Sequence, residues 1–197
     1  MDNEKTLQNY ESNSIYYPPG GILVWLLIIL EIFTFLGASL VFMYYRGIEW
    51  DDFLAFRMHI NPVVGTINTV ILITSGYFMA NSLHQLRSGE NGKAAQQILI
   101  GLLFGVLFLV VKGAEYYFKI EAGIGLGSNT FFTFYWLMTG FHFIHVLFGV
   151  GLLTYMYQGV KSNKYDAKNM FDVESSATYW HMCDLIWILI FPVLYLI

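Results

Sequence analysis

Five long runs of apolar residues dominate the chain, and short segments rich in polar residues separate them. The apolar runs cover residues 22–45, 63–84, 96–118, 131–157 and 178–197. Each run is long enough for a membrane-spanning helix, which needs about 20 mostly apolar residues. Turn-forming residues fill the connections, as between Ser88 and Gly92, and Pro62 suits the first turn of the second helix. The pattern predicts an all-α integral membrane bundle of five transmembrane helices.

The composition supports this prediction and excludes several other classes of protein. Only 12% of the residues are charged and 56% are hydrophobic, whereas soluble domains carry roughly 25% charged residues. An ordinary soluble enzyme, a disordered tail and a secreted disulfide scaffold are therefore excluded, and the single Cys183 cannot form an internal disulfide. The net charge of -4 gives no basis for binding nucleic acid. We expect one membrane domain over residues 22–197 and no separate soluble domain.

Basic residues in the connections indicate the orientation, because Lys and Arg accumulate on the cytoplasmic side of a membrane. If the N-terminus lies inside, six such residues fall in inner segments and three in outer ones. The inner residues are Lys5, Arg87, Lys93, Lys161, Lys164 and Lys168, and the outer ones are Arg46, Arg57 and Lys119. We therefore expect the N-terminus inside and the C-terminus outside. Residues 1–21 carry more acidic than basic side chains, and they then form a retained cytoplasmic tail rather than a signal peptide.

Aromatic residues gather near the predicted helix ends. Tyr135, Trp136, Tyr179 and Trp180 are examples. Tyrosine and tryptophan are enriched at both membrane surfaces, where their rings sit at the level of the lipid headgroups. The positions of these residues therefore predict aromatic belts.

Several polar side chains nevertheless fall inside the predicted spans. A charged side chain at membrane depth costs about 2.5–3.5 kcal/mol or more, so each needs a partner or a purpose. Glu31 stands near the middle of the first span with no Lys or Arg within one helical turn. Its carboxyl must be protonated, hydrogen-bonded to another helix or reached by water. A neutral acid bonded to a neighbouring helix and a proton-related or lipid-facing site both remain open.

The other polar residues in the spans occur in pairs three positions apart, which places both members on one helix face. The pairs are Lys112 with Glu115, His142 with His145, and His181 with Asp184. The first pair predicts a structural ion pair, and the two histidine pairs could meet in one polar cluster inside the bundle. That cluster is either a buried hydrogen-bond network or a site for a metal or haem, since histidine is the commonest metal ligand. Di-iron bundles use Glu-x-x-His motifs, and the sequence has none.

One helix carries a spacing of small residues that favours close packing. Gly101 and Gly105 form a small-x-x-x-small pair, which lets two membrane helices approach each other closely. We interpret this pair as a helix-packing surface rather than part of a ligand site.

Two segments near the C-terminus resemble motifs of subunit III of the haem–copper oxidases, a family that serves cytochrome c and quinol oxidases. Residues 139–149 resemble its Thr-Gly-Phe-His-x-x-His-Val motif, and residues 179–187 resemble its Tyr-Trp-His-Phe-Val-Asp-x-x-Trp motif. Three further matches follow the family's order: Glu31 in residues 29–35, residues 67–75 with His84 beyond them, and Glu115 with Tyr116. The resemblance covers about residues 22–197 and is closest to short, five-helix members of bacterial type.

The resemblance implies an accessory subunit with no haem, copper or other metal of its own. Such a subunit packs against the catalytic subunit I, beside the copper-bearing subunit II, in the bacterial inner membrane. It binds phospholipid, supports proton uptake and protects the catalytic subunit during turnover, and it can belong to a respiratory supercomplex. The family implies proton- or lipid-linked roles for Glu31 and His84. It implies a structural polar core formed by Glu115, His142, His145, His181 and Asp184.

Two departures from the family pattern affect these expectations. Many members have seven helices, and a V-shaped cleft between their first two helices and the other five holds lipids. This chain matches only the last five, so another subunit must complete the cleft or the cleft is absent. In addition, Lys112 stands where the family pattern has glutamine, and Phe143 replaces a commonly small residue.

Three alternative functions remain open at this point. A short, five-spanning subunit III-like partner of nitric oxide reductase belongs to the same family. A self-contained membrane metal or haem protein could use His142, His145 and His181. A small proton-coupled transporter could be built around Glu31.

Overall fold

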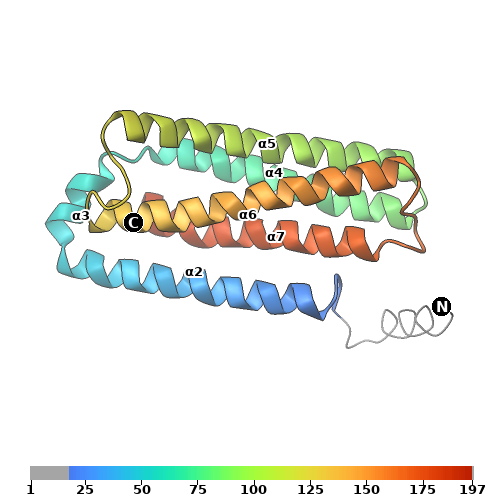
Figure 1. Ribbon diagram of the computed structural model, residues 1–197, viewed down its shortest axis with the longest axis horizontal. Coiled ribbons are helices and arrows are strands. Elements are labelled where there is room, and N and C mark those ends of the chain that lie inside the picture. Colours follow the sequence, from blue (N-terminus) through green and yellow to red (C-terminus); the bar gives the residue numbers. More distant parts are fainter. Residues whose placement is uncertain (1–17, 197) are drawn as a thin grey trace.

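A computed structural model describes residues 18–196, which form six α-helices and a terminal π-helical turn (Figure 1). Five helices are long and apolar enough to cross a membrane. Their bounds are Ile22–Ile48 (α2), Pro62–Arg87 (α4), Asn91–Glu121 (α5), Thr130–Lys161 (α6) and Phe171–Phe191 (α7), which the turn η1 (Pro192–Leu196) extends. The predicted all-α bundle of five spans is confirmed. Most of the predicted cytoplasmic tail, residues 1–17, lies outside the described residues.

The helices extend beyond the apolar runs. Helix α7 begins at Phe171 rather than at residue 178, and its first turn carries Asp172 and Glu174. Acidic side chains there are favourable, because the N-terminal end of a helix carries a partial positive charge. Hydropathy therefore located the apolar part of each helix and missed its polar ends.

A short helix, α3 (Trp50–Arg57), occupies part of the first connection, for which the sequence pattern predicts a loop. Asp51 and Asp52 lie in its first turn, and Phe53 is buried. Both aspartates are favourably placed at a helix N-terminus.

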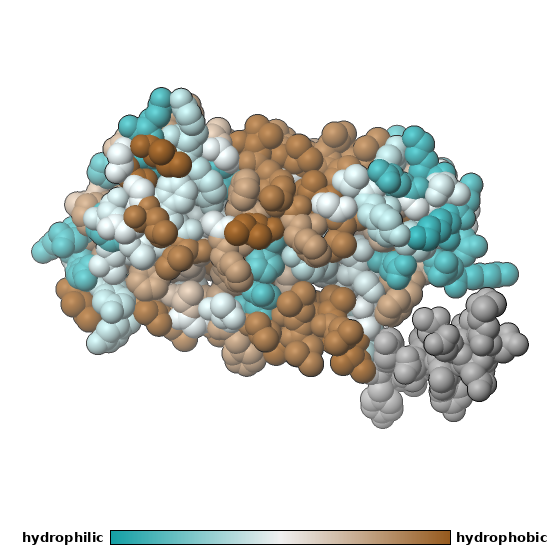
Figure 2. Space-filling view, in the orientation of Figure 1, coloured by the Kyte–Doolittle hydropathy of each residue, from teal (hydrophilic) through white to brown (hydrophobic). Residues whose placement is uncertain are grey.

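Helices α4, α5, α6 and α7 pack into a four-helix bundle. In it, α4 and α6 each contact both α5 and α7. Phe108, Tyr135, Trp180 and Trp187 are fully buried in this bundle. Helix α2 lies outside it, against α6 and α7, and leaves much of its apolar surface exposed (Figure 1). Figure 2 shows a broad hydrophobic band around the middle, hydrophilic residues at both ends and a small hydrophilic patch within the band.

Glycines allow the helices to meet around Trp180. A Cβ atom on Gly105 would lie 2.6 Å from Trp180 Cη2, and one on Gly149 would lie 2.7 Å from Trp180 Cε3. The indole Nε1–H donates to Ser75 Oγ at 3.1 Å, and that hydroxyl donates to the Gly101 carbonyl at 2.6 Å. Gly101 therefore faces α4 while Gly105 faces α7, so the predicted packing pair lies against two different helices.

Local capping fixes where two of the spans begin. Asn61 Oδ1 accepts from Val63 N at 2.9 Å, with Pro62 at the first helical position as expected, and Asn129 Oδ1 caps α6 through Phe132 N at 2.8 Å. These side chains pair backbone N–H groups that a helix leaves free at its start.

The connection between α6 and α7 is also held by a buried side chain. The Tyr165 hydroxyl donates to Asp172 Oδ2 at 2.9 Å. Burial, together with this hydrogen bond, raises the pKa of the Tyr165 phenol above its usual value.

Candidate functional site

Glu31 of α2 and His145 of α6 form a buried polar pair. Glu31 Oε1 lies 3.3 Å from His145 Nε2, and only 8% of the Glu31 side chain and 11% of the His145 side chain are exposed. His145 Nδ1 lies 2.8 Å from the Phe141 carbonyl oxygen, which can only accept a hydrogen bond. Nδ1 therefore carries a proton, and Nε2 is the atom that meets the carboxyl group. A hydrogen bond between Nε2 and Oε1 then requires one shared proton, supplied by either residue.

Lys112 forms the centre of a second polar group, at the end of the bundle where α5 ends and α6 begins. Its side chain is fully buried, and Nζ lies 2.9 Å from Glu115 Oε2. The ammonium also donates to the hydroxyls of Tyr135, at 3.0 Å, and Tyr195. Both tyrosines donate to Glu115 in turn, Tyr135 at 2.7 Å and Tyr195 at 3.1 Å. Residues of α5, α6 and η1 thus enclose one ion pair, in which lysine and carboxylate each have several partners.

Lys119 adds a further positive charge to this group, which we call the lysine cluster (Lys112, Glu115, Lys119, Tyr135 and Tyr195). Its Nζ lies 3.6 Å from Glu115 Oε1 and donates to the His59 carbonyl at 3.1 Å. Two lysines therefore share one carboxylate.

His181 and Asp184 form a third pair on α7. His181 Nδ1 lies 3.1 Å from Asp184 Oδ2, and the His181 side chain is 39% exposed. The second carboxylate oxygen, Oδ1, is buried and has no hydrogen-bond partner among the described residues. On α4, a Cβ atom on Gly76 would collide with Oδ2, so the absence of a side chain there makes room for the aspartate.

His142 is buried among aromatic rings. Its ring lies 5.2 Å from that of Trp187 and 5.8 Å from that of Phe108, centroid to centroid. Neither ring nitrogen has a hydrogen-bond partner in the described part of the chain. His142, His145 and His181 thus have different immediate partners, and the two histidine pairs do not combine into the single cluster that the spacing suggested. Within residues 18–196, no three His, Cys, Asp or Glu side chains lie close enough together to hold a metal ion.

His84 lies in the last turn of α4 and is exposed. Its carbonyl oxygen accepts a hydrogen bond from the Ser88 hydroxyl at 3.1 Å. Its imidazole is not among the contacts of Glu31. The two residues to which the family gives proton- or lipid-linked roles therefore belong to different parts of the molecule.

The aromatic-belt interpretation is wrong for three of the four residues named for it. Tyr135, Tyr179 and Trp180 are buried, and each takes part in a hydrogen bond inside the bundle. Tyr135 and Lys119, which sequence reasoning assigned to a belt and a loop, belong instead to the lysine cluster. Lys119 lies about one turn beyond Glu115 on α5, so its spacing was a signal in the sequence. Tyr135 lies on α6, and its place in the cluster follows only once the packing of α5 against α6 is known.

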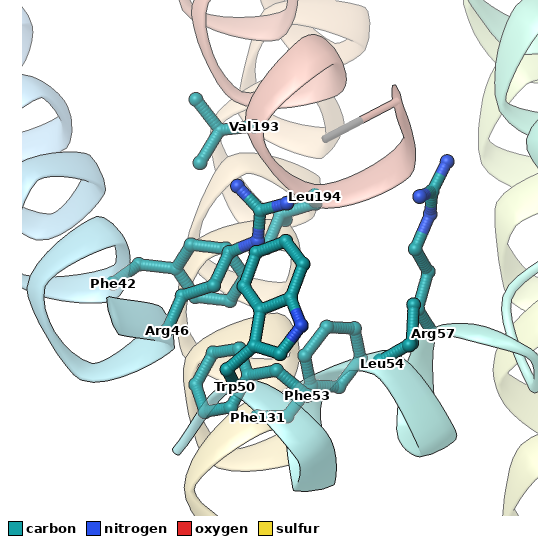
Figure 3. A pocket seen from close by; sticks show the side chains of 9 residues that line it. All are labelled: Phe42, Arg46, Trp50, Phe53, Leu54, Arg57, Phe131, Val193 and Leu194. Carbon is teal, nitrogen blue, oxygen red and sulfur yellow. The ribbon is translucent and has the colours of Figure 1, made fainter. Parts of the chain in front are cut away.

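A shallow hollow at the same end of the bundle carries two more basic residues. Phe42, Phe53, Phe131 and Leu194 are among the residues that line it, and the guanidinium group of Arg46 lies 4.7 Å from the centre of the Trp50 ring (Figure 3). Arg57 donates to the Leu196 carbonyl at 2.9 Å and so ties α3 to the end of the chain. Neither arginine pairs with a carboxylate among the described residues.

A bundle of five apolar spans with paired polar side chains in its interior defines a multi-pass α-helical membrane protein. Residues 21–197 match the family model for cytochrome c oxidase subunit III, and the chain therefore belongs to that family. The family expected from the two histidine motifs is thus confirmed.

Curated relatives agree with the family model. The chain is 29% identical over 177 residues to cytochrome c oxidase subunit 3 of Synechocystis, a match that covers 88% of this chain and 74% of that protein. It is 37% identical over 139 residues to the protein of the same name from Rhipicephalus sanguineus, covering 68% of this chain and 52% of the relative. For the Heterololigo bleekeri protein the identity is 27% over 153 residues, with 76% and 56% covered. The chain thus spans between about half and three quarters of the length of these relatives.

Proposed function

We propose that this chain is the accessory third subunit of a haem–copper terminal oxidase, which reduces O₂ to water and pumps protons. Its role is to bind the catalytic subunit I, beside the copper-bearing subunit II, and to stabilise it during turnover. The redox centres, haem and copper, belong to those partners. The match of residues 21–197 to the subunit III family is the observation that carries this proposal. The five-span bundle supports it, since nearly the whole described chain is membrane domain.

Glu31 is the candidate for a proton- or lipid-linked role inside the bundle, and His145 of the expected structural polar core is its immediate neighbour. They form a buried polar pair between α2 and the four-helix bundle, with Oε1 and Nε2 3.3 Å apart. His84, exposed at the end of α4, is a separate candidate for contact with lipid headgroups or with protons at the membrane surface. Bound phospholipid is part of the proposal, in contact with the exposed apolar surface of α2.

The remaining polar residues have a structural role in this proposal. The buried pair of Lys112 and Glu115 joins α5 to α6 and η1 through two tyrosines. Asp184 and His181 lie where α7 meets α4. His142 fills space among aromatic rings.

The proposed location is a bacterial inner membrane, with the N-terminus inside and the C-terminus outside. The alternation of the five helices supports the orientation, because Arg87, Lys93 and Lys161 fall at the same end of the bundle as the start of α2 (Figure 1). Single cysteines introduced at Gly92 and Ser128, in a Cys183→Ser background, test it with a membrane-impermeant thiol reagent. Only the cysteine at Ser128 is expected to react in intact cells, because Gly92 follows the helix end that faces inward.

Purification of the complex from native membranes tests the functional proposal. A tagged chain is expected to bring with it a haem-bearing subunit and a copper-bearing subunit, either alone or within a larger respiratory assembly. Recovery of a nitric oxide reductase core would contradict the oxidase assignment. Stoichiometric metal or a haem spectrum in the isolated chain would support a self-contained metalloprotein, and solute uptake by liposomes containing only this chain would support a transporter.

A further inference from the structure

A cavity opens between the start of α4 and the end of α5, beside the lysine cluster. Its volume is about 450 Å³, within the range of roughly 300–1,000 Å³ that is common for small-molecule sites. Both helices and the two connections next to them contribute to its lining. It lies away from α2, and neither Glu31 nor His84 contributes to it.

The lining of the cavity divides into a polar and an apolar part. Lys119 and Glu115 supply the charged groups. His59 and Asn61, just before the start of α4, also line the cavity. Val64, Val111 and Phe118 form apolar wall along the two helices. From Lys119 to Val111, helix α5 covers eight positions, or roughly 12 Å at 1.5 Å per residue, so the apolar wall extends toward the membrane interior. Such a lining suits a molecule with a charged head and a hydrocarbon chain.

The charges of the lysine cluster favour a negative head. Lys112 and Lys119 are both buried and share Glu115 as their only carboxylate within the described residues. Glu115 already accepts from Lys112, Tyr135 and Tyr195, and its distance to Lys119 is a long 3.6 Å. Lys119 has three N–H donors, and the described residues include one close acceptor for them, the His59 carbonyl at 3.1 Å. Because a buried charge is costly without a partner, an anion in the cavity would neutralise the excess positive charge.

We propose that this cavity binds an anionic amphiphile, with a singly charged phosphate or carboxylate head at the Lys119 ammonium and the hydrocarbon chain along Val64, Val111 and Phe118. A membrane phospholipid and a free fatty acid both have this chemistry. The site is additional to the lipid contacts proposed for α2 and needs only that the chain lies in a membrane. It does not depend on which oxidase or reductase subunits accompany the chain.

Native mass spectrometry of the purified, delipidated complex tests the proposal. The probes are phosphatidylglycerol, oleate and the zwitterionic phosphatidylcholine, each titrated separately. Wild type is expected to bind one copy of phosphatidylglycerol or oleate in preference to phosphatidylcholine. Lys119→Gln should weaken that binding about tenfold, as expected for the loss of a charged hydrogen-bond donor. Lys93→Gln is the matched control, because Lys93 is an exposed lysine at the other end of α5.

A second variant keeps the proposal testable if Lys119→Gln fails to fold. Ala114→Phe leaves every charge in place and fills the cavity that Ala114 lines, so it should abolish binding of both anionic probes. Preference for phosphatidylglycerol identifies a phospholipid as the natural source, and preference for oleate identifies a fatty acid. Equal binding of all three probes, or unchanged binding in both Lys119→Gln and Ala114→Phe, would overturn the proposal. The identity of the co-purifying subunits is read in the same spectra, so an error in the proposed function is seen separately.

Discussion

Glu31 and His145 meet across the contact between α2 and the four-helix bundle, with Oε1 and Nε2 3.3 Å apart. The second nitrogen of His145 is already occupied by the Phe141 carbonyl. A single proton between Nε2 and Oε1 can join the two side chains, either as a neutral acid and imidazole or as an ion pair, while Glu31 Oε2 is buried without a hydrogen-bond partner among the described residues. Apolar side chains such as Phe35 and Phe42 also pack α2 against α6, and this pair adds a polar connection between the two helices.

Replacement of His145 by leucine should leave Glu31 as a neutral carboxylic acid. An isolated carboxylate in an apolar environment is too costly, so the group takes up a proton instead. Infrared spectra of His145→Leu should contain a carboxylic C=O band that is absent when Glu31→Gln is added. Leaving the buried carboxyl group without this partner should also lower the free energy of unfolding by about 1–3 kcal/mol. Phe148→Leu, an exposed substitution on the same helix, is the control, and identical spectra for the single and double variants would contradict the prediction.

Glu31→Gln should leave the rate of O₂ reduction close to that of wild type while the subunit remains bound. The reason is that the proposed subunit holds no redox centre, and glutamine keeps the size and one acceptor of the side chain. Steady-state oxygen consumption per haem tests the rate, and loss of activity over many turnovers tests the protective role. If a complex with all subunits present loses all activity, the accessory function is wrong.

Removal of Lys112 and removal of Glu115 should destabilise the bundle less in combination than the sum of the two single effects. Lys112→Met leaves Glu115 buried beside two tyrosines with Lys119 only at 3.6 Å, and breaking a buried pair costs about 3–5 kcal/mol. In Lys112→Met/Glu115→Gln the amide still accepts from the tyrosines, and the one charge left in the lysine cluster is that of Lys119, which keeps the His59 carbonyl as an acceptor. The double variant should therefore lose less stability than the two single variants together. Thermal unfolding in detergent measures this, with the exposed Lys93→Met as control; simple additivity would contradict it.

The fold was largely predictable because a helix that spans a membrane needs a long apolar run, and such runs are visible in the sequence. Five spans and the start of α4 at Pro62 follow from hydropathy and from proline geometry. The helical ends did not follow, because α3 and the first turns of α7 lie beyond the apolar runs and begin with acidic residues such as Asp51 and Asp172, which favour a helix N-terminus. Hydropathy contains no information about these ends.

The polar pairs were only partly predictable, for a physical reason. Lys112 with Glu115 and His181 with Asp184 are local along one helix, so spacing alone placed each pair on one face. The partnership of Glu31 with His145 depends on how α2 rotates against α6, and hydropathy does not set that rotation. The roles of Tyr135 and Tyr195 in the lysine cluster likewise depend on packing between helices.

The glycines around Trp180 make a prediction with an internal control. In Gly149→Ala the new methyl would lie 2.7 Å from the Trp180 ring, and such overpacking usually costs about 1–3 kcal/mol. Gly151, two residues further along α6, has no neighbouring atom within 4 Å of the position that a Cβ atom would occupy. Gly151→Ala should therefore be neutral or slightly stabilising, by up to about 1 kcal/mol, because alanine favours helix. Melting temperatures of the two variants test this. A melting temperature of Gly149→Ala as high as that of Gly151→Ala would contradict the prediction and show that Trp180 can shift away from the new methyl group.

Replacement of His181 by alanine should weaken assembly of the subunit. The change removes the hydrogen-bond partner of Asp184 Oδ2, while Oδ1 is already buried without a partner among the described residues. Leaving this carboxyl unpaired should cost about 1–3 kcal/mol and loosen the contact between α7 and α4. Leu185→Ala is the control, since Leu185 follows Asp184 in sequence and is 53% exposed. The amount of this chain retained by the purified complex, relative to the haem-bearing subunit, should fall for His181→Ala and remain unchanged for Leu185→Ala. Normal retention and an unchanged melting temperature in His181→Ala would mean that the pair does not hold the bundle together.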